Sequence, residues 1–265
     1  MTQLEIAVDG GIALVTFASL PGGFMNDDTA AELNGYLDRA EGDGAIRATI
    51  FTGGEPGVFI RHFDVATLEA RGRAMAARGL RFDPARPVPE SPYLAALRRI
   101  EESPRPFVAA INGVAMGGGF ELALACDIRL ARTGDYPLGL PEINIGLLPG
   151  AGGTQRLTRL IGEAKALELL LQGRTFGPEE ARGLGLVSEC VAGDVVGRAR
   201  EIAGRLAGQH PKALAHIKRL VRGVQGRPAA DGLADERTLF CDLMVDADSI
   251  ALMADFNAGK RGIRD

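Results

Sequence analysis

The sequence predicts an α/β protein that ends in a helical region. Three observations support this fold class: short apolar segments of strand length recur along the first 200 residues, helical patterns lie between them, and the C-terminal third is almost entirely helical. A chain of 265 residues is near the upper limit of a single domain. We expect a core over residues 1–200 and a C-terminal helical region over residues 201–265, in one continuous chain and not as an independent domain.

The strands are predicted from short apolar runs bounded by Gly, Pro and polar residues. They are expected at residues 4–8, 12–17, 48–51, 107–111, 128–131 and 186–191, with a further short strand starting at residue 58. The first two flank Asp9-Gly10, and an Asp-Gly pair supplies the positive φ that a tight turn requires. This pair therefore predicts a β-hairpin at the N-terminus.

The helices are predicted from apolar residues at three- and four-residue spacing. They are expected at about residues 27–41, 66–80, 92–102, 155–161 and 163–172, and again from residue 178 onward on both sides of the last strand. Residues 81–92 are rich in Arg and Pro, and we expect a mobile surface loop there.

Composition and charge argue against several classes of function. The chain has 30 basic and 34 acidic residues, and the net charge of −4 argues against a nucleic-acid partner. No apolar run approaches the ~18 residues of a membrane span, and the N-terminus is too mixed for a signal peptide. Cys126, Cys190 and Cys241 fit neither a metal pattern nor a disulfide framework. We therefore expect a soluble cytoplasmic protein with reduced thiols and no membrane partner.

Three adjacent glycines, Gly117–Gly119, lie between a predicted strand and a predicted helix. Glycine is entropically costly in regular structure, so some feature here must require a backbone without Cβ. One possibility is close approach of a ligand to N–H groups at the start of the helix. The other is a tight turn where strand and helix pack closely. A phosphate loop is excluded, because Phe120 and Glu121 follow in place of Lys and Ser or Thr.

Two glutamates are candidates for acid–base chemistry: one follows the glycine run directly, and the other lies in an apolar segment further along the chain. Glu121 starts an apolar helix, where its carboxylate would also suit the helix dipole, and Glu142 follows Pro141 in an apolar segment. If the two converged on one pocket, burial and mutual repulsion would spread their titrations and divide acid and base roles. The chain has no Gly-x-Ser-x-Gly motif, and no histidine has an obvious nucleophile partner or a metal spacing: His62, His210 and His216.

Two long blocks resemble the crotonase (enoyl-CoA hydratase/isomerase) family. Residues 114–127 (VAMGGGFELALACD) are similar to its central motif, and LPE at residues 140–142 followed by GLLPGAGGTQRL at 146–157 is similar to its second motif. Looser similarity runs from about residue 4 to residue 261. The resemblance implies a crotonase-like spiral of ββα units with a C-terminal helical trimerisation region, and a homotrimer or homohexamer.

The resemblance also implies an activity and its residues. The expected reaction is hydration of 2-trans-enoyl-CoA to 3-hydroxyacyl-CoA, with Glu121 and Glu142 as catalytic acid and base in an order that the sequence leaves open. The backbone N–H groups of Phe63 and Gly118 match the oxyanion hole that would stabilise the thioester enolate. An acyl-CoA thioester is the expected substrate; coenzyme A enters with it, and neither a cofactor nor a metal is expected. The substrate-binding residues implied are Arg61, His62, Asp64, Gly117, Pro141 and Gly150.

The chain departs from the family pattern before Phe63. Family members usually have a small residue and then glycine where this chain has Arg61 and His62. Arg61 could reach a coenzyme A phosphate and His62 could lie in the pocket, or both side chains could face solvent. Two alternatives to hydration remain: another crotonase-type reaction (isomerisation, decarboxylation or C–C hydrolysis), or a non-catalytic binding protein of this fold. The two glutamates and the acidic net charge argue against the latter.

Overall fold

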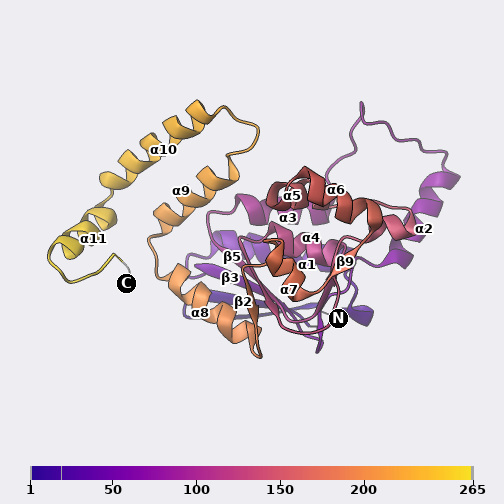
Figure 1. Cartoon of the computed structure of the whole chain (residues 1–265), viewed down its shortest axis with the longest axis horizontal. Coiled ribbons are helices and arrows are strands. Elements are labelled where there is room, and N and C mark those ends of the chain that lie inside the picture. Colours follow the sequence, from indigo (N-terminus) through magenta and orange to yellow (C-terminus); the bar gives the residue numbers. More distant parts are fainter. Residues whose placement is uncertain (1, 19, 264–265) are drawn as a thin grey trace.

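The computed structural model describes residues 2–18 and 20–263, in which ten strands form two sheets (Figure 1). The larger sheet contains, in spatial order, β1 (Leu4–Asp9), β2 (Ile12–Phe17), β3 (Ala48–Gly53), β5 (Phe107–Ile111), β7 (Ile128–Arg132) and β10 (Glu189–Val191). The smaller sheet contains β4 (Val58–Ile60), β6 (Val114–Met116), β8 (Leu138–Gly139) and β9 (Thr175–Phe176). Neighbouring strands are parallel except in the pairs β1–β2 and β8–β9.

The chain passes repeatedly from the larger sheet to the smaller one. In the pairs β3–β4, β5–β6 and β7–β8, the first strand joins the larger sheet and the second joins the smaller sheet. Helices α2 (Val65–Ala77), α4 (Gly118–Ala125) and α5 (Gly153–Ile161) follow these three pairs. This repetition is a spiral of ββα units, so the predicted α/β fold class is confirmed.

Both faces of the central strands β3 and β5 are buried, and their side chains alternate between the two faces as strand geometry requires. On one face, Ile50 and Val108 pack against α8 (Val195–Ala207). On the other face, Phe51 and Phe107 stack with ring centroids 5.6 Å apart in the core between the sheets. Burial on both faces explains why these strands are continuously apolar in the sequence.

The remaining helices of the body cover the core between and beside the sheets. They are α1 (Asp27–Gly42), α3 (Pro92–Glu102), α6 (Glu163–Gln172) and α7 (Pro178–Gly183), with short 3₁₀ helices at Pro21–Gly23 and Glu142–Ile145. The hairpin predicted at the N-terminus is confirmed, since Asp9 pairs with Ile12 and the intervening Gly10 and Gly11 both have positive φ. The exposed loop predicted before α3 is also present, over residues 81–91.

One predicted strand is shorter in the structure. Residues 186–191 were expected to be extended, but β10 begins only at residue 189. The amides of Leu186 and Val187 donate to the carbonyl of Ala181 in α7, and Arg129 donates to the carbonyl of Leu186. Because these backbone groups already have partners at the end of a helix, residues 186 and 187 cannot join the sheet ladder.

The last three helices stand away from the body (orange to yellow in Figure 1). We call them the C-terminal arm: α9 (Pro211–Arg222), α10 (Ala229–Met244) and α11 (Ala247–Asn257), in which no residue is buried. The predicted division at residue 200 falls inside α8, which packs on the sheet. No helix in the described ranges is long and apolar enough to cross a membrane.

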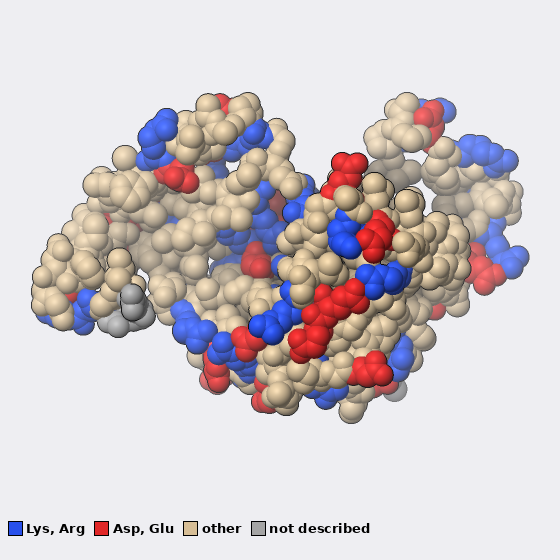
Figure 2. Space-filling view, in the orientation of Figure 1, with Lys and Arg blue, Asp and Glu red and all other residues tan. Residues whose placement is uncertain are grey.

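A recess of about 580 Å³ separates α9 from the body. Lys and Arg side chains gather along it in Figure 2, and those that line it include Arg129, Arg156, Lys218 and Arg222. Two of these cations bridge the recess, because Lys218 and Arg222 on α9 both pair with the carboxylate of Asp127, at 2.8 and 3.0 Å. The arm is therefore anchored to the body by partly buried ion pairs at its first helix.

Candidate active site

The turn between β6 and α4 depends on its glycines. Gly117 has φ 49° and ψ −127°, a conformation that residues with a Cβ rarely adopt. A Cβ atom added to Gly119 would lie 2.3 Å from the carbonyl oxygen of Ile60, and one added to Gly118 would lie 3.1 Å from Met25 Sδ. Close packing of strand and helix is thus one reason for the three glycines.

The same turn brings two backbone amides together. Residues 62 and 64 bond to Met25 on one side of the chain, since Met25 donates to His62 and Asp64 donates to Met25. The N–H of Phe63, between them, points to the other side. There it meets α4: a Cβ added to Gly118 would lie 3.6 Å from Phe63 N. Within the described chain, neither the Phe63 nor the Gly118 amide donates to a protein acceptor, so both N–H groups are available for a ligand oxygen.

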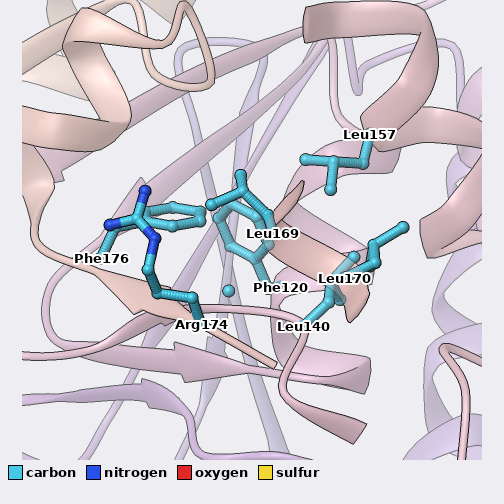
Figure 3. A pocket seen from close by; sticks show the side chains of 8 residues that line it. Phe120, Leu140, Leu157, Leu169, Leu170, Arg174 and Phe176 are labelled. Carbon is cyan, nitrogen blue, oxygen red and sulfur yellow. The ribbon is translucent and has the colours of Figure 1, made fainter. Parts of the chain in front are cut away.

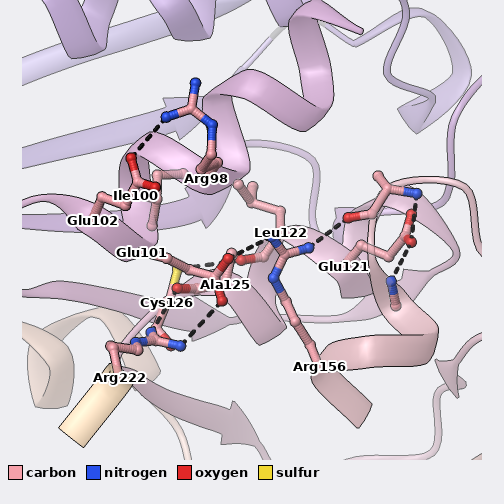
Figure 4. A network of polar contacts seen from close by, with 12 residues as sticks. Arg98, Ile100, Glu101, Glu102, Glu121, Leu122, Ala125, Cys126, Arg156 and Arg222 are labelled. Atoms are coloured by element: carbon pink, nitrogen blue, oxygen red, sulfur yellow. Dashed lines mark hydrogen bonds and ion pairs between the residues drawn. The ribbon is translucent and has the colours of Figure 1, made fainter. Parts of the chain in front are cut away.

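Glu121 lies in the first turn of α4 with only 2% of its surface exposed. Its Oε1 accepts hydrogen bonds from the amides of Ala151 and Gly153, both at 2.8 Å (Figure 4). A Cβ on Gly153 would lie 2.9 Å from that oxygen, so only glycine allows this approach. Burial raises the pKa of Glu121, while the two amides act in the opposite direction and favour the carboxylate.

Glu142 begins the 3₁₀ helix after β8 and is partly buried. Its Oε2 is buried and has no hydrogen-bond partner among the described residues, and its Oε1 lies next to Gly117, 3.2 Å from where a Cβ of that residue would be. Burial, and then the negative charge of Glu121, raise the pKa of Glu142 to about 7. The two carboxyl groups therefore interact, and they share the neighbourhood of the Gly117–Gly119 turn. An unpaired buried carboxyl oxygen is rare in purely structural positions.

A cluster of mostly apolar side chains surrounds Phe120, the residue before Glu121 in α4 (Figure 3). Phe120 and Phe176 meet edge to face with ring centroids 5.7 Å apart, and leucines from three segments surround them: Leu140, Leu157, Leu169 and Leu170. Leu140 also approaches Gly153, which donates to Glu121. Burial is the first cause of the raised pKa of both carboxyl groups.

A chain of polar contacts supports the loop that holds Glu121 (Figure 4). Arg156 donates from Nη1 to the carbonyl of Ala151 and pairs through Nη2 with Glu101 at 2.6 Å. Glu101 in turn pairs with Arg222 of the C-terminal arm at 3.2 Å. Sequence reasoning did not identify Arg156 or Glu101, because nothing in the local pattern indicates a pairing between residues 55 positions apart.

Of the other residues predicted to bind substrate, Gly117 and Pro141 lie beside Glu142, and the rest lie in other surroundings. Arg61 lies over Gly23 and pairs with Glu55 at 3.4 Å, and Asp64 caps α2 by accepting from the amides of Ala66 and Thr67. Gly117 and Pro141 flank Glu142, the former beside its Oε1 and the latter as its chain neighbour. Gly150 is exposed and faces open space.

His62 contacts the turn that carries the candidate oxyanion donor. Its Cβ lies 3.4 Å from the Cβ position of Gly117, and its ring lies 4.5 Å, centroid to centroid, from that of Phe24. Its Nδ1 is 2.8 Å from the carbonyl oxygen of Phe63. His62 therefore lies at the edge of the site and not in bulk solvent, with Glu142 across Gly117 from it.

One group of side chains in the described ranges has ligand atoms close enough for a metal ion: His210, Asp246 and Asp248. Both ring nitrogens of His210 already have partners, because Nδ1 accepts from the Ala213 amide and Nε2 lies 3.0 Å from Asp246. Asp246 also accepts from the amide of Ser249 and so caps α11. These contacts join α9 to α11, far from the glutamates in the sequence.

Comparisons with known proteins agree with this geometry. The family model described as enoyl-CoA hydratase/isomerase matches residues 8–257. A probable enoyl-CoA hydratase from Bacillus subtilis (strain 168) is 36% identical over 227 residues, which cover 83% of this chain and 82% of that protein. The structure of DspI from Pseudomonas aeruginosa superposes with a TM-score of 0.86 at 32% identity, covering 98% of this chain and 95% of that one.

An enoyl-CoA hydratase subunit I from Geobacillus kaustophilus HTA426 gives a TM-score of 0.85 at 32% identity, covering 98% of this chain and 96% of that one. The similarity therefore extends through the whole architecture, including the spiral of ββα units that brings Phe63 and Gly118 together. The chain belongs to the enoyl-CoA hydratase/isomerase family and has the crotonase fold.

Proposed function

We propose that this protein catalyses the reversible hydration of 2-trans-enoyl-CoA to 3-hydroxyacyl-CoA. The observation that carries the proposal is the combination of two free amides, on Phe63 and Gly118, with two interacting carboxyl groups, buried on Glu121 and partly buried on Glu142. The amides suit a thioester oxygen that becomes negative, and the carboxyl groups suit the two proton transfers that addition of water requires.

The amides act on the acyl carbonyl. When water attacks Cβ of the enoyl thioester, electron density moves through Cα to the thioester oxygen. Hydrogen bonds from Phe63 N–H and Gly118 N–H would stabilise that enolate, and loss of one such donor typically costs about 3 kcal/mol of transition-state stabilisation. Both donors are backbone groups, one at the start of α4 and the other in a segment bridged to Met25, so they need little reorganisation during the reaction.

The carboxyl groups divide the proton transfers. We assign Glu121 as the base, since two amides hold its Oε1 and favour the charged form, leaving Oε2 to accept a proton from water. We assign Glu142 as the acid, because a pKa of about 7 keeps a large share of it protonated near neutral pH, when it can deliver a proton to Cα. Each role contributes about 10²–10⁴-fold in rate.

The remaining partner predictions belong to this proposal. Arg61, His62, Asp64, Gly117, Pro141 and Gly150 are the candidate contacts to the acyl-CoA. Water is the only second reactant in hydration, so the chemistry calls for no cofactor beyond the coenzyme A of the substrate.

The C-terminal arm exposes large apolar side chains, among them Phe240, Val245 and Phe256, which supports a homotrimer or homohexamer. Light scattering tests this: a mass of one 27.9 kDa chain would contradict it.

Addition of crotonyl-CoA to the protein tests the proposed reaction. Hydration removes the conjugation between the double bond and the thioester, so the ultraviolet absorbance of that chromophore should fall with time. Longer 2-trans-enoyl-CoA substrates should be tried in parallel. If the absorbance stays constant with every chain length, hydration is not the activity of this site.

Arg61 and His62 are expected to restrict the acyl-CoA substrates that the enzyme accepts. They stand beside the Phe63 amide, where bulk alters the space around the thioester. Arg61→Ala and His62→Gly should each change the ratio of kcat/KM between short and long acyl chains by about tenfold, the size of a contact worth 1.4 kcal/mol. Steady-state kinetics on a series of acyl-CoAs measures this, and unchanged ratios in both variants would show that neither residue sets specificity.

His62 also favours a second candidate activity. Another crotonase-type reaction, such as isomerisation, decarboxylation or C–C hydrolysis, could use an imidazole at the edge of the site opposite Glu142. Product analysis by mass spectrometry separates these reactions from hydration: hydration adds one water (about 18 Da) and leaves the carbon chain intact, isomerisation leaves the mass unchanged, decarboxylation lowers it, and C–C hydrolysis adds water but breaks a carbon–carbon bond.

A further inference from the structure

Tyr93 in α3 has a contact to the candidate oxyanion hole that no sequence motif indicated. Its hydroxyl donates a hydrogen bond to the carbonyl oxygen of Gly118 at 2.5 Å, and the side chain is buried. The acceptor belongs to the residue whose N–H is one of the two candidate oxyanion donors. A carbonyl oxygen has two lone pairs, so this bond is compatible with a helical bond to the same oxygen.

The ring of Tyr93 also reaches the second donor. It lies against the ring of Phe63 with centroids 6.4 Å apart and planes inclined at 47°. Phe63 and Gly118 come from different turns of the spiral, one just before α2 and the other at the start of α4. Tyr93 therefore contacts both residues that supply the free amides, through its hydroxyl in one case and its ring in the other.

The local backbone explains why such a contact is needed. The donor lies in a run of three glycines, which have no side chains of their own to hold a conformation and the widest choice of φ and ψ. The amide of Gly117 is fixed by the carbonyl of Gly139 at 2.9 Å, but Gly118 N–H has no protein partner that could orient it. The bond from Tyr93 fixes the carbonyl side of Gly118 instead. Burial and the charge of Glu121 raise the pKa of Tyr93, so its hydroxyl stays protonated and remains a donor.

We propose that Tyr93 is a positioning residue of the active site, which holds the Gly118 and Phe63 amides at the separation that one thioester oxygen requires. The inference rests on the proposed function of those amides. Tyr93 itself touches no reacting atom; it acts through the two residues that do.

Replacing Tyr93 with Phe removes the hydroxyl and keeps the ring. We expect kcat for hydration to fall about tenfold, with KM within about twofold of wild type, because displacement of a catalytic group by less than 1 Å affects the transition state more than substrate binding. Tyr36→Phe is the matched control: it removes another buried hydroxyl, which bonds to Thr49 Oγ1 at 2.6 Å away from the site. That variant should lose stability but keep the wild-type kcat.

A spectroscopic measurement separates positioning from general loosening of the fold. Cinnamoyl-CoA is a conjugated thioester whose absorbance shifts to longer wavelength when donors polarise its carbonyl. Bound to wild type it should show such a shift, and bound to Tyr93→Phe a smaller one, whereas Tyr36→Phe should match wild type. Equal kcat in Tyr93→Phe and wild type, or equal losses in Tyr93→Phe and Tyr36→Phe, would overturn the proposal. If wild type itself neither hydrates enoyl-CoA nor shifts the probe, the proposed function fails first, and the role of Tyr93 with it.

Discussion

Glu142→Gln is expected to lower kcat for hydration by about 10²–10⁴-fold, the usual contribution of a general acid. Glutamine has nearly the same shape as glutamic acid but cannot deliver a proton to Cα. Glu121→Gln should cause a loss of similar size, because an amide cannot accept the proton of the attacking water. Steady-state hydration of crotonyl-CoA measures both. Glu102→Gln, an exposed glutamate paired with Arg98, is the control and should keep the wild-type rate.

The pH dependence of hydration tests whether Glu142 is the acid. Its pKa of about 7 lies above the ordinary value of 4.5, so the protonated and reactive form predominates below pH 7. As pH rises through about 7 this proton is lost, and kcat/KM for hydration should fall about tenfold per pH unit. A profile that rises through pH 7 would instead make Glu142 the base. The assignment of roles, though not the reaction, would then be reversed.

The same raised pKa affects stability. A carboxyl group that binds its proton more tightly in the folded protein stabilises the fold fully below the unfolded pKa, and this stabilisation is lost as pH rises through the folded pKa. Unfolding free energy should therefore fall between about pH 4.5 and 7 through Glu142. Urea titrations at both ends of this window should show a smaller difference for Glu142→Gln than for wild type.

Arg156→Met is expected to destabilise the protein by about 3 kcal/mol, because it removes one partner of a buried ion pair. The Arg156 and Glu101 side chains are 8% and 16% exposed and lie 2.6 Å apart. The variant also removes the donor to the Ala151 carbonyl, whose own amide holds Glu121. We therefore expect kcat to fall about tenfold as well, because the carboxylate of Glu121, the proposed base, would be held less firmly. Urea unfolding and hydration kinetics give the two readouts.

A double-mutant cycle and an exposed pair serve as controls. Glu101→Met should be similarly destabilising, and the double variant should lose less stability than the sum, since it leaves no unpaired charge between the two positions. Arg98→Met breaks exposed pairs with Glu90 and Glu102 and should cost less than about 1 kcal/mol. Additive losses in the cycle, or equal losses in Arg98→Met and Arg156→Met, would show that the buried pair is not what supports the loop.

The parts of the fold that the sequence predicts well are those with local patterns. The hairpin follows from Asp9-Gly10, and α1 and α3 follow from the spacing of their apolar residues. The order of strand, glycine turn and helix around Gly117 can also be predicted directly from the sequence. The smaller sheet was largely missed, because β8 and β9 have two residues each and β6 has three. So short a segment shows no periodicity, and only its pairing partners define it as a strand.

The candidate site likewise contains residues that local sequence motifs indicate and contacts that appear only in the folded structure. The two sequence motifs indicate Glu121, Glu142 and Gly118 as site residues. Whether these residues lie close together depends on how successive turns of the spiral stack, which the motifs do not specify. Tyr93 and Arg156 act through contacts to residues 25 and 55 positions away, and neither lies in a pattern that indicates such a partner. The orphaned Oε2 of Glu142 is likewise a property of the packed structure alone.

The complete burial of α4 has a consequence for how new activities can arise from this scaffold. All eight of its residues are buried, and a Cβ added to Gly119 would collide with the backbone of β4. Directed evolution that randomises α4 should therefore yield mostly unfolded clones. Libraries at the exposed loop 81–91 should yield mostly folded clones, and libraries at Arg61 and His62 should yield folded clones with altered acyl preferences. We therefore expect new substrates to be acquired through the loops, while the helix that carries the candidate oxyanion amide should tolerate little variation.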